Sequence, residues 1–138
     1  MAISLVKSGV KVNNVDLTDY VTAITLNRSF DELEITKLGS TGHEFVKGLE
    51  ASSLTLSLLN DAATATVLPT LQAAYGTSVT VKLIQEKGTA VSATNPLYTM
   101  TCLINNLQDI NGAATDLATM DLTWTVNGTV AVATSGTF

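Results

Sequence analysis

Apolar and polar residues alternate one by one along several stretches of the chain. This period of two places successive side chains on opposite faces of a β-strand, so each stretch predicts a strand with one buried face. The apolar members are Leu54, Leu56 and Leu58; Val79, Val81 and Leu83; Tyr98, Met100, Cys102 and Ile104; and Ala118, Met120, Leu122, Trp124 and Val126. Thr and Ser occupy many of the positions between them, and the branched Cβ of Thr suits a pleated strand without adding charge.

The first thirty residues predict a hairpin followed by a longer strand. Two short apolar stretches flank Asn13-Asn14, and Asn tolerates the positive φ that a type I′ turn requires. A strand is expected from about Val21 to Phe30, with Ile24, Leu26 and Phe30 on one face.

One stretch, rich in Ala and Thr, breaks the alternation between Asn60 and Gly76. Its apolar residues recur at helical spacing. Proline is tolerated in the first turn of a helix and breaks an interior turn, so one short helix is expected to start near Pro69.

Two long connections separate the predicted elements, Asp31–Gly48 and Glu86–Pro96. Long loops on a small β domain are often functional. The chain contains no internal repeat, linker or low-complexity tract, so residues 1–138 are expected to form a single domain.

Composition narrows the function classes. The 138 residues include 22 Thr and 10 Ser, only 14% are charged, and the net charge is −5. The chain lacks the Lys/Arg clusters that neutralise phosphates, and no apolar run approaches the ~18 residues of a membrane span. Residues 88–138 contain three acids and no base, which suggests a uniformly negative surface. With a mean hydropathy of +0.32, much of the surface is expected to be covered by partners.

The candidate chemistry of the chain is sparse. Cys102 lies on the apolar face of its strand and His43 in a polar loop, so buried packing and solvation are favoured over a catalytic pair. The acidic cluster at residues 31–34 lacks the spacing of a calcium loop and is interpreted as a solvated edge. Trp124 is interpreted as core. No catalytic, cofactor or metal site, and no enzymatic activity, is predicted.

A longer run of residues resembles the tail tube (major tail) proteins of bacteriophages with long, non-contractile tails. The run begins at Val15-Asp16-Leu17-Thr18-Asp19-Tyr20-Val21 and continues through Ile24–Glu34, Thr36–Glu44, Gly48-Leu49-Glu50 and Ser53–Leu58. An acidic turn, a Thr-x-x-Gly-x-x-Gly segment, a Gly-Leu pair and an alternating strand follow in that order. Ser92–Tyr98 and the final Thr-rich strands are also similar to that group, so the resemblance covers about residues 15–128.

This resemblance implies an all-β fold, a β-sandwich or partly closed barrel with one short helix. It also implies a structural virion protein that forms hexameric rings, which stack into the tube through which DNA passes during ejection. The implied partners are other copies of the chain, the tape-measure protein, and the tail terminator and distal tail proteins. DNA would pass through the tube without specific binding. The protein would be located in the tail of the virion, and in the host cytoplasm during assembly.

Two groups of candidate residues follow from the resemblance. The long loop Asp31–Gly48 is expected to reach the adjacent ring, and its candidates are Asp31, Glu32, Glu34, Lys37, Gly39, Gly42, His43 and Glu44. Acidic or hydroxyl residues are expected to line the lumen, led by Thr119, Asp121 and Thr123. The first alternative is a related phage protein, such as a tube terminator, a distal-tail component or a capsid decoration protein. The second is a small carbohydrate-binding β-sandwich module.

Overall fold

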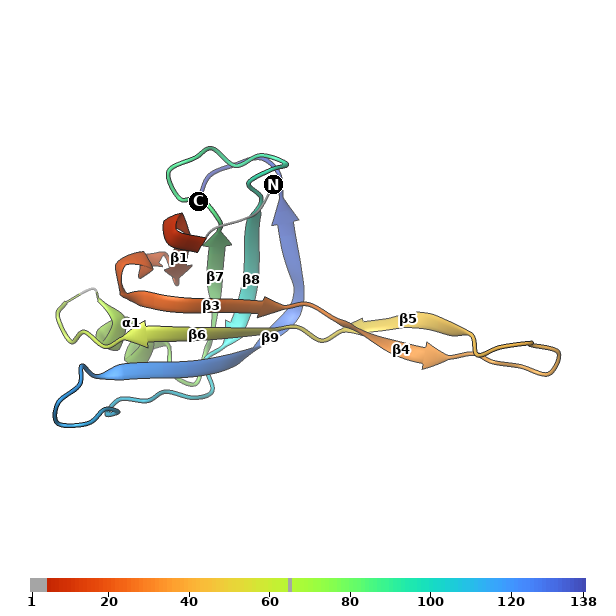
Figure 1. Cartoon of the computed structure of the whole chain (residues 1–138), viewed down its shortest axis with the longest axis horizontal. Coiled ribbons are helices and arrows are strands. Elements are labelled where there is room, and N and C mark those ends of the chain that lie inside the picture. Colours follow the sequence, from red (N-terminus) through yellow and green to blue (C-terminus); the bar gives the residue numbers. More distant parts are fainter. Residues whose placement is uncertain (1–4, 65) are drawn as a thin grey trace.

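The computed structural model describes residues 5–64 and 66–138 (Figure 1). Its strands are β1 (Gly9–Val12), β2 (Val15–Asp16), β3 (Val21–Asn27), β4 (Phe30–Glu34), β5 (Phe45–Glu50), β6 (Ser53–Leu59), β7 (Ser78–Ile84), β8 (Leu97–Leu103) and β9 (Thr119–Ala133). Its helices are α1 (Val67–Ala74) and the 3₁₀ turns η1 (Leu5–Lys7) and η2 (Thr18–Tyr20). The predicted all-β fold with one short α-helix is confirmed.

One antiparallel sheet forms the body of the molecule, in the order β2-β1-β7-β8-β9-β6-β3. The sheet is curled into a half-barrel, in which β3, β6 and the first part of β9 run across β7 and β8 (Figure 1). Strand β9 belongs to both parts, because its first part pairs with β6 and its second part with β8. It bends near Gly128, whose φ of 81° is easily adopted only by glycine.

The apolar faces of the strands meet on the inner side of this curl. Alternate residues of β6 and of the first part of β9 are buried, as the period of two predicts. Trp124 is fully buried, and its indole Nε1 donates a hydrogen bond to the Asn106 carbonyl oxygen at 3.3 Å. Helix α1 contributes Val67 and Leu71 to the same core.

Local predictions near the N-terminal end are partly confirmed. Strands β1 and β2 form the expected hairpin, with φ of 50° at Asn13 and 66° at Asn14. The strand predicted over Val21–Phe30 is wrong in its second part, because β3 ends at Asn27. Phe30 begins β4 and is exposed, so it does not share the buried face of Ile24 and Leu26.

The prediction of an unstructured loop over Asp31–Gly48 is wrong. The two ends of this segment are paired backbone: β4 and β5 form a two-stranded antiparallel hairpin, and residues 35–44 connect them. This hairpin projects from the body beyond the ends of β3 and β6 (Figure 1). We call residues 30–50 the arm. The sequence pattern missed these strands because neither of them buries one face regularly.

Replacing Trp124 with Ala should reduce the free energy of unfolding by about 3–5 kcal/mol, because it leaves a large cavity in the core. Urea unfolding followed by circular dichroism measures this loss. Thr125→Ala, which changes an exposed neighbour on the opposite face of β9, should cost less than about 1 kcal/mol. Equal losses from the two variants would contradict the assignment of the buried face.

Candidate assembly surfaces

The arm is the most exposed part of the structure. Strands β4 and β5 pair only with each other and form a sheet separate from the body. All five residues of β4 are exposed. The candidate residues of the predicted inter-ring loop all lie here: Asp31, Glu32 and Glu34 on β4, and Lys37, Gly39, Gly42, His43 and Glu44 in the connection that leads to β5.

The two faces of the arm differ in chemistry. Leu33 lies opposite Val46, and Ile35 follows on the same side, so this part of one face of the hairpin is apolar, while Asp31 lies on that side next to Gly48. The other face is mixed and carries the pair Glu34–Phe45. On that face the Lys47 ammonium lies 4.1 Å from the centre of the Phe30 ring.

Large apolar side chains are concentrated on the arm. Among the residues that the structure describes, twelve large apolar side chains are exposed, and seven of them belong to the arm. These seven are Phe30, Leu33, Ile35, Leu38, Phe45, Val46 and Leu49. In soluble proteins, large exposed apolar patches are typical of surfaces that bind another protein or a membrane.

The charged residues of the arm pair weakly with one another. The Lys37 ammonium lies 3.1 Å from the Glu44 carboxylate, and His43 Nδ1 lies 3.1 Å from Glu34 Oε2. All four side chains are exposed, and exposed pairs contribute only ~0–1 kcal/mol each. The acidic cluster is therefore a solvated edge, as the sequence predicted.

The base of the arm is anchored to the body through Glu50. Its side chain is only 4% exposed, accepts a hydrogen bond from the Ser52 hydroxyl at 2.9 Å and lies 3.8 Å from the Arg28 guanidinium. The Val130 N–H, on the far side of the bend in β9, donates to the same carboxylate oxygen at 3.5 Å. Reasoning from the sequence missed this role, because nothing in the sequence links Glu50 to Val130.

The predicted lumen residues lie together on a different surface. Thr119, Asp121 and Thr123 project from β9 away from the buried Met120 and Leu122. Across the β6 pairing the Ser57 hydroxyl donates to Asp121 Oδ1 at 2.7 Å, and the Thr55 and Thr123 hydroxyls lie 3.2 Å apart. We call the outward side of β3, β6 and the first part of β9 the hydroxyl face.

Strand β3 leaves one edge of the large sheet open. It is the last strand in the order of the sheet and pairs with β6 alone. Alternate residues along this seven-residue strand present backbone N–H and C=O groups to the side away from β6. An open edge of this length is a template for pairing with another chain.

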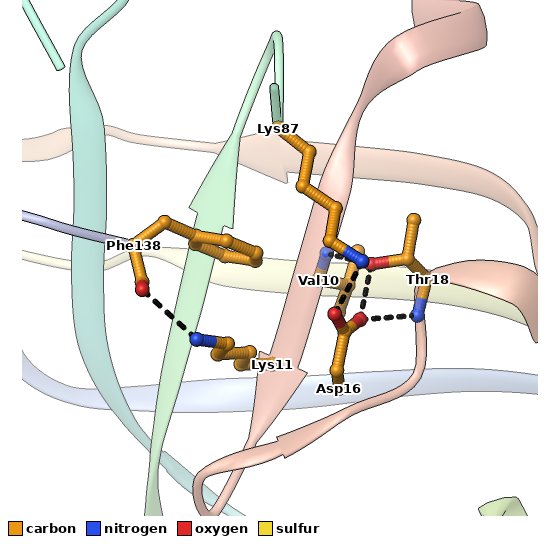
Figure 2. Close-up of polar contacts among 6 residues, drawn as sticks. All are labelled: Val10, Lys11, Asp16, Thr18, Lys87 and Phe138. Atoms are coloured by element: carbon orange, nitrogen blue, oxygen red, sulfur yellow. Dashed lines mark hydrogen bonds and ion pairs between the residues drawn. The ribbon is translucent and has the colours of Figure 1, made fainter. Parts of the chain in front are cut away.

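Figure 2 shows a polar cluster that fixes the hairpin of β1 and β2 to the loop after β7. The Asp16 carboxylate is paired with Lys87 and accepts hydrogen bonds from the backbone N–H and the hydroxyl of Thr18. The Thr18 hydroxyl oxygen in turn accepts a bond from the Val10 N–H at 3.1 Å. Burial by itself raises the pKa of Asp16, but the hydrogen bonds from Lys87 and Thr18 outweigh it and hold the pKa below its usual value.

A second contact in Figure 2 holds the last residues of the chain against β1. Lys11 Nζ donates to the Phe138 carbonyl oxygen at 2.9 Å and lies 4.6 Å from the centre of its ring. A Cβ at Gly9 would come within 2.8 Å of that ring, so a residue larger than glycine would displace it.

The two residues considered for catalysis are not brought together. Cys102 is buried in the core, and burial raises the pKa of its thiol to about 11, whereas His43 is exposed on the arm. Within residues 5–64 and 66–138, no three His, Cys, Asp or Glu side chains cluster closely enough to hold a metal ion. None of the helices in this described part has the length and apolarity to cross a membrane.

A scan against models of protein families and a search among curated proteins find no match.

Asp16→Asn should lower the free energy of unfolding by about 1 kcal/mol at pH 7, because it removes the ion pair with Lys87. The carboxylate stabilises the fold above the ~3.9 pKa of an unfolded Asp, and this contribution disappears as pH falls through the lower folded value. The difference between wild type and variant should therefore shrink below about pH 4. Urea unfolding over a pH series measures it, with the exposed Asp19→Asn as control; a difference independent of pH would refute the assignment.

Proposed function

We propose that the protein is a structural subunit that assembles into rings and then into the tail tube of a long-tailed phage. The arm is the observation that carries the proposal. A lone two-stranded hairpin is at best marginally stable in water, and this one exposes seven large apolar side chains. An arm of this kind is suited to a surface supplied by a partner.

A second copy of the chain is the partner that best explains the exposed surfaces. The arm projects from one end of the body, and the open edge of β3 runs along the body toward it (Figure 1). Contacts made by two different surfaces of one chain are heterologous, and they generate rings or open filaments. A tube of stacked rings uses both kinds of contact, one within rings and one between them.

The hydroxyl face supports the role of a DNA conduit. It is largely neutral, and its central charge is Asp121. A wall without bases releases no counterions from DNA and so does not bind it, and a carboxylate repels phosphates within the ~8–10 Å Debye length. We therefore assign Thr119, Asp121 and Thr123 to the lumen. The resemblance alone implies the hexameric ring and the partners, which are the tape-measure, terminator and distal-tail proteins.

The alternatives differ in their assemblies. A terminator, distal-tail or decoration protein would form isolated rings or trimers instead of tubes. A carbohydrate-binding module would need an exposed aromatic platform, and the buried Trp124 offers none. Negative-stain microscopy of concentrated protein, alone and with a tape-measure protein, tests the proposal directly. Tubes are expected, and a monomer under all of these conditions would refute it.

Shortening the arm should abolish stacking without unfolding the body. Deleting Lys37–Glu44 and replacing the remaining Ile35-Thr36 with Asn-Gly closes the hairpin at the Glu34–Phe45 pair with a type I′ turn. Because the deleted residues lie outside the core, urea unfolding should be unchanged while tubes disappear from micrographs. The control is Thr41→Ala, which keeps the length of the arm. Tubes of normal length from the shortened variant would contradict the inter-ring role.

Asp121→Lys tests the lumen assignment. The variant should form tubes, and these tubes should retain linear duplex DNA, with less retention as salt is raised. Wild-type tubes should not retain DNA. Cosedimentation of labelled DNA with tubes measures retention. Asp19→Lys makes the same charge change on η2. Equal retention by both variants would show that Asp121 does not face the channel.

A further inference from the structure

The end of the body away from the arm carries a second group of exposed apolar side chains. Helix α1 and the loop between β8 and β9 lie at this end (Figure 1). Tyr75, at the end of α1, and Ile110 and Leu117, in the loop, are three of the five large exposed apolar side chains that the described residues carry outside the arm. The two ends of the molecule therefore both present apolar surface.

A hollow of about 220 Å³ lies at this second end. It is lined by Gln72, Tyr75, Leu107 and Asp109, so its wall is partly apolar and carries one carboxylate. Leu107 also packs against the core, and the Asn60 side-chain amide donates to the Asp109 carbonyl oxygen at 3.2 Å. These contacts hold the loop to the end of β6, so the hollow has a fixed floor.

The end with the hollow is acidic, and the tip of the arm carries one exposed ammonium, Lys37, that can complement it. The end with the hollow carries Asp61, Asp109 and Asp116, and the sequence has no Lys or Arg at residues 48–81 or after residue 87. Lys37 is the one Lys or Arg in the turn of the arm, at residues 35–44, and its side chain is 73% exposed. Its pairing with Glu44 is an exposed contact of the kind that contributes little and is readily exchanged.

The tip of the arm also offers an apolar side chain of suitable size. Leu38, beside Lys37, is fully exposed and is not packed against the core formed by the described residues. A leucine side chain next to an ammonium matches a hollow whose walls are Tyr75 and Leu107 and whose rim carries Asp109.

We propose, on the basis of the proposed function, that the arm of one copy docks in this hollow of the next copy along the tube. Leu38 packs against Tyr75 and Leu107, and Lys37 pairs with Asp109. Because tip and hollow lie at opposite ends of the same chain, each copy has one of each to offer, and the contact repeats without closing. The hollow is then the receiving half of the contact between rings.

Reciprocal charge reversal tests the pair. Lys37→Glu and Asp109→Lys, each alone, should raise the concentration needed for sedimentable tubes about tenfold or more, because each puts like charges together. The double variant Lys37→Glu/Asp109→Lys should return it to within about threefold of wild type, since every arm then meets an opposite charge on the next copy. Lys7→Glu, the same charge change on the body, should assemble as wild type does. A double variant no better than the single variants would overturn the pairing.

Disulfide trapping tests the contact even if no tube forms. Leu38→Cys protein mixed with Tyr75→Cys protein, with oxygen of the air as the oxidant, should give a disulfide between the two, identified by peptide mass spectrometry. It should exceed by about tenfold the yield with Thr101→Cys, an exposed site on β8. The buried Cys102, whose thiol pKa is raised to about 11, stays out of the reaction near pH 8. A disulfide without tubes would support the docking of the arm and refute the proposed tube. Tubes without the disulfide would support the tube and refute the docking.

Discussion

The burial of the core depends on the bend in β9. This strand pairs first with β6 and then with β8, so it is the seam between the two parts of the sheet. Three residues of β9, 128–130, stand opposite Met100 alone, and the positive φ of Gly128 lets the strand turn there. The turn folds the apolar side of β7 and β8 toward that of β3 and β6 around Trp124. A straight β9 would leave both apolar sides open to water.

The polarity of the outer surface follows from this one-sided burial. Once the apolar members of each strand face inward, the alternating Ser, Thr and Asp residues must face outward. Their hydroxyls and carboxylates bond across the strands, as Ser57 does with Asp121, so the face is polar but weakly charged. The wall of a water-filled tube and an ordinary solvated surface both require polar residues at these positions. Only the position of neighbouring copies would distinguish the two.

The arm differs from the body because its residues do not form a hydrophobic core. Its strands pair with each other, and at its base the buried Glu50 carboxylate contacts Arg28, Ser52 and the Val130 N–H of β9. This anchor attaches the arm to the body, while the apolar side chains of Leu33, Ile35 and Val46 stay exposed among the residues that the structure describes. Rigid placement of an uncovered surface lowers the entropy that association would otherwise cost.

The sequence by itself determined the elements that bury one face. Alternation located the body strands from β6 onward and the burial of Trp124 and Cys102, and Asn13-Asn14 located the first turn, because these signals depend on neighbours in the chain. The same logic failed for β4 and β5, where no buried face imposes a period of two, and for Phe30, which follows the end of β3. Only the tertiary structure decided that residues 31–48 form a paired arm, that Glu50 anchors it, and that the arm and the hollow beside α1 lie at opposite ends. These features depend on contacts between residues distant in the chain, and the curl of the sheet sets those contacts.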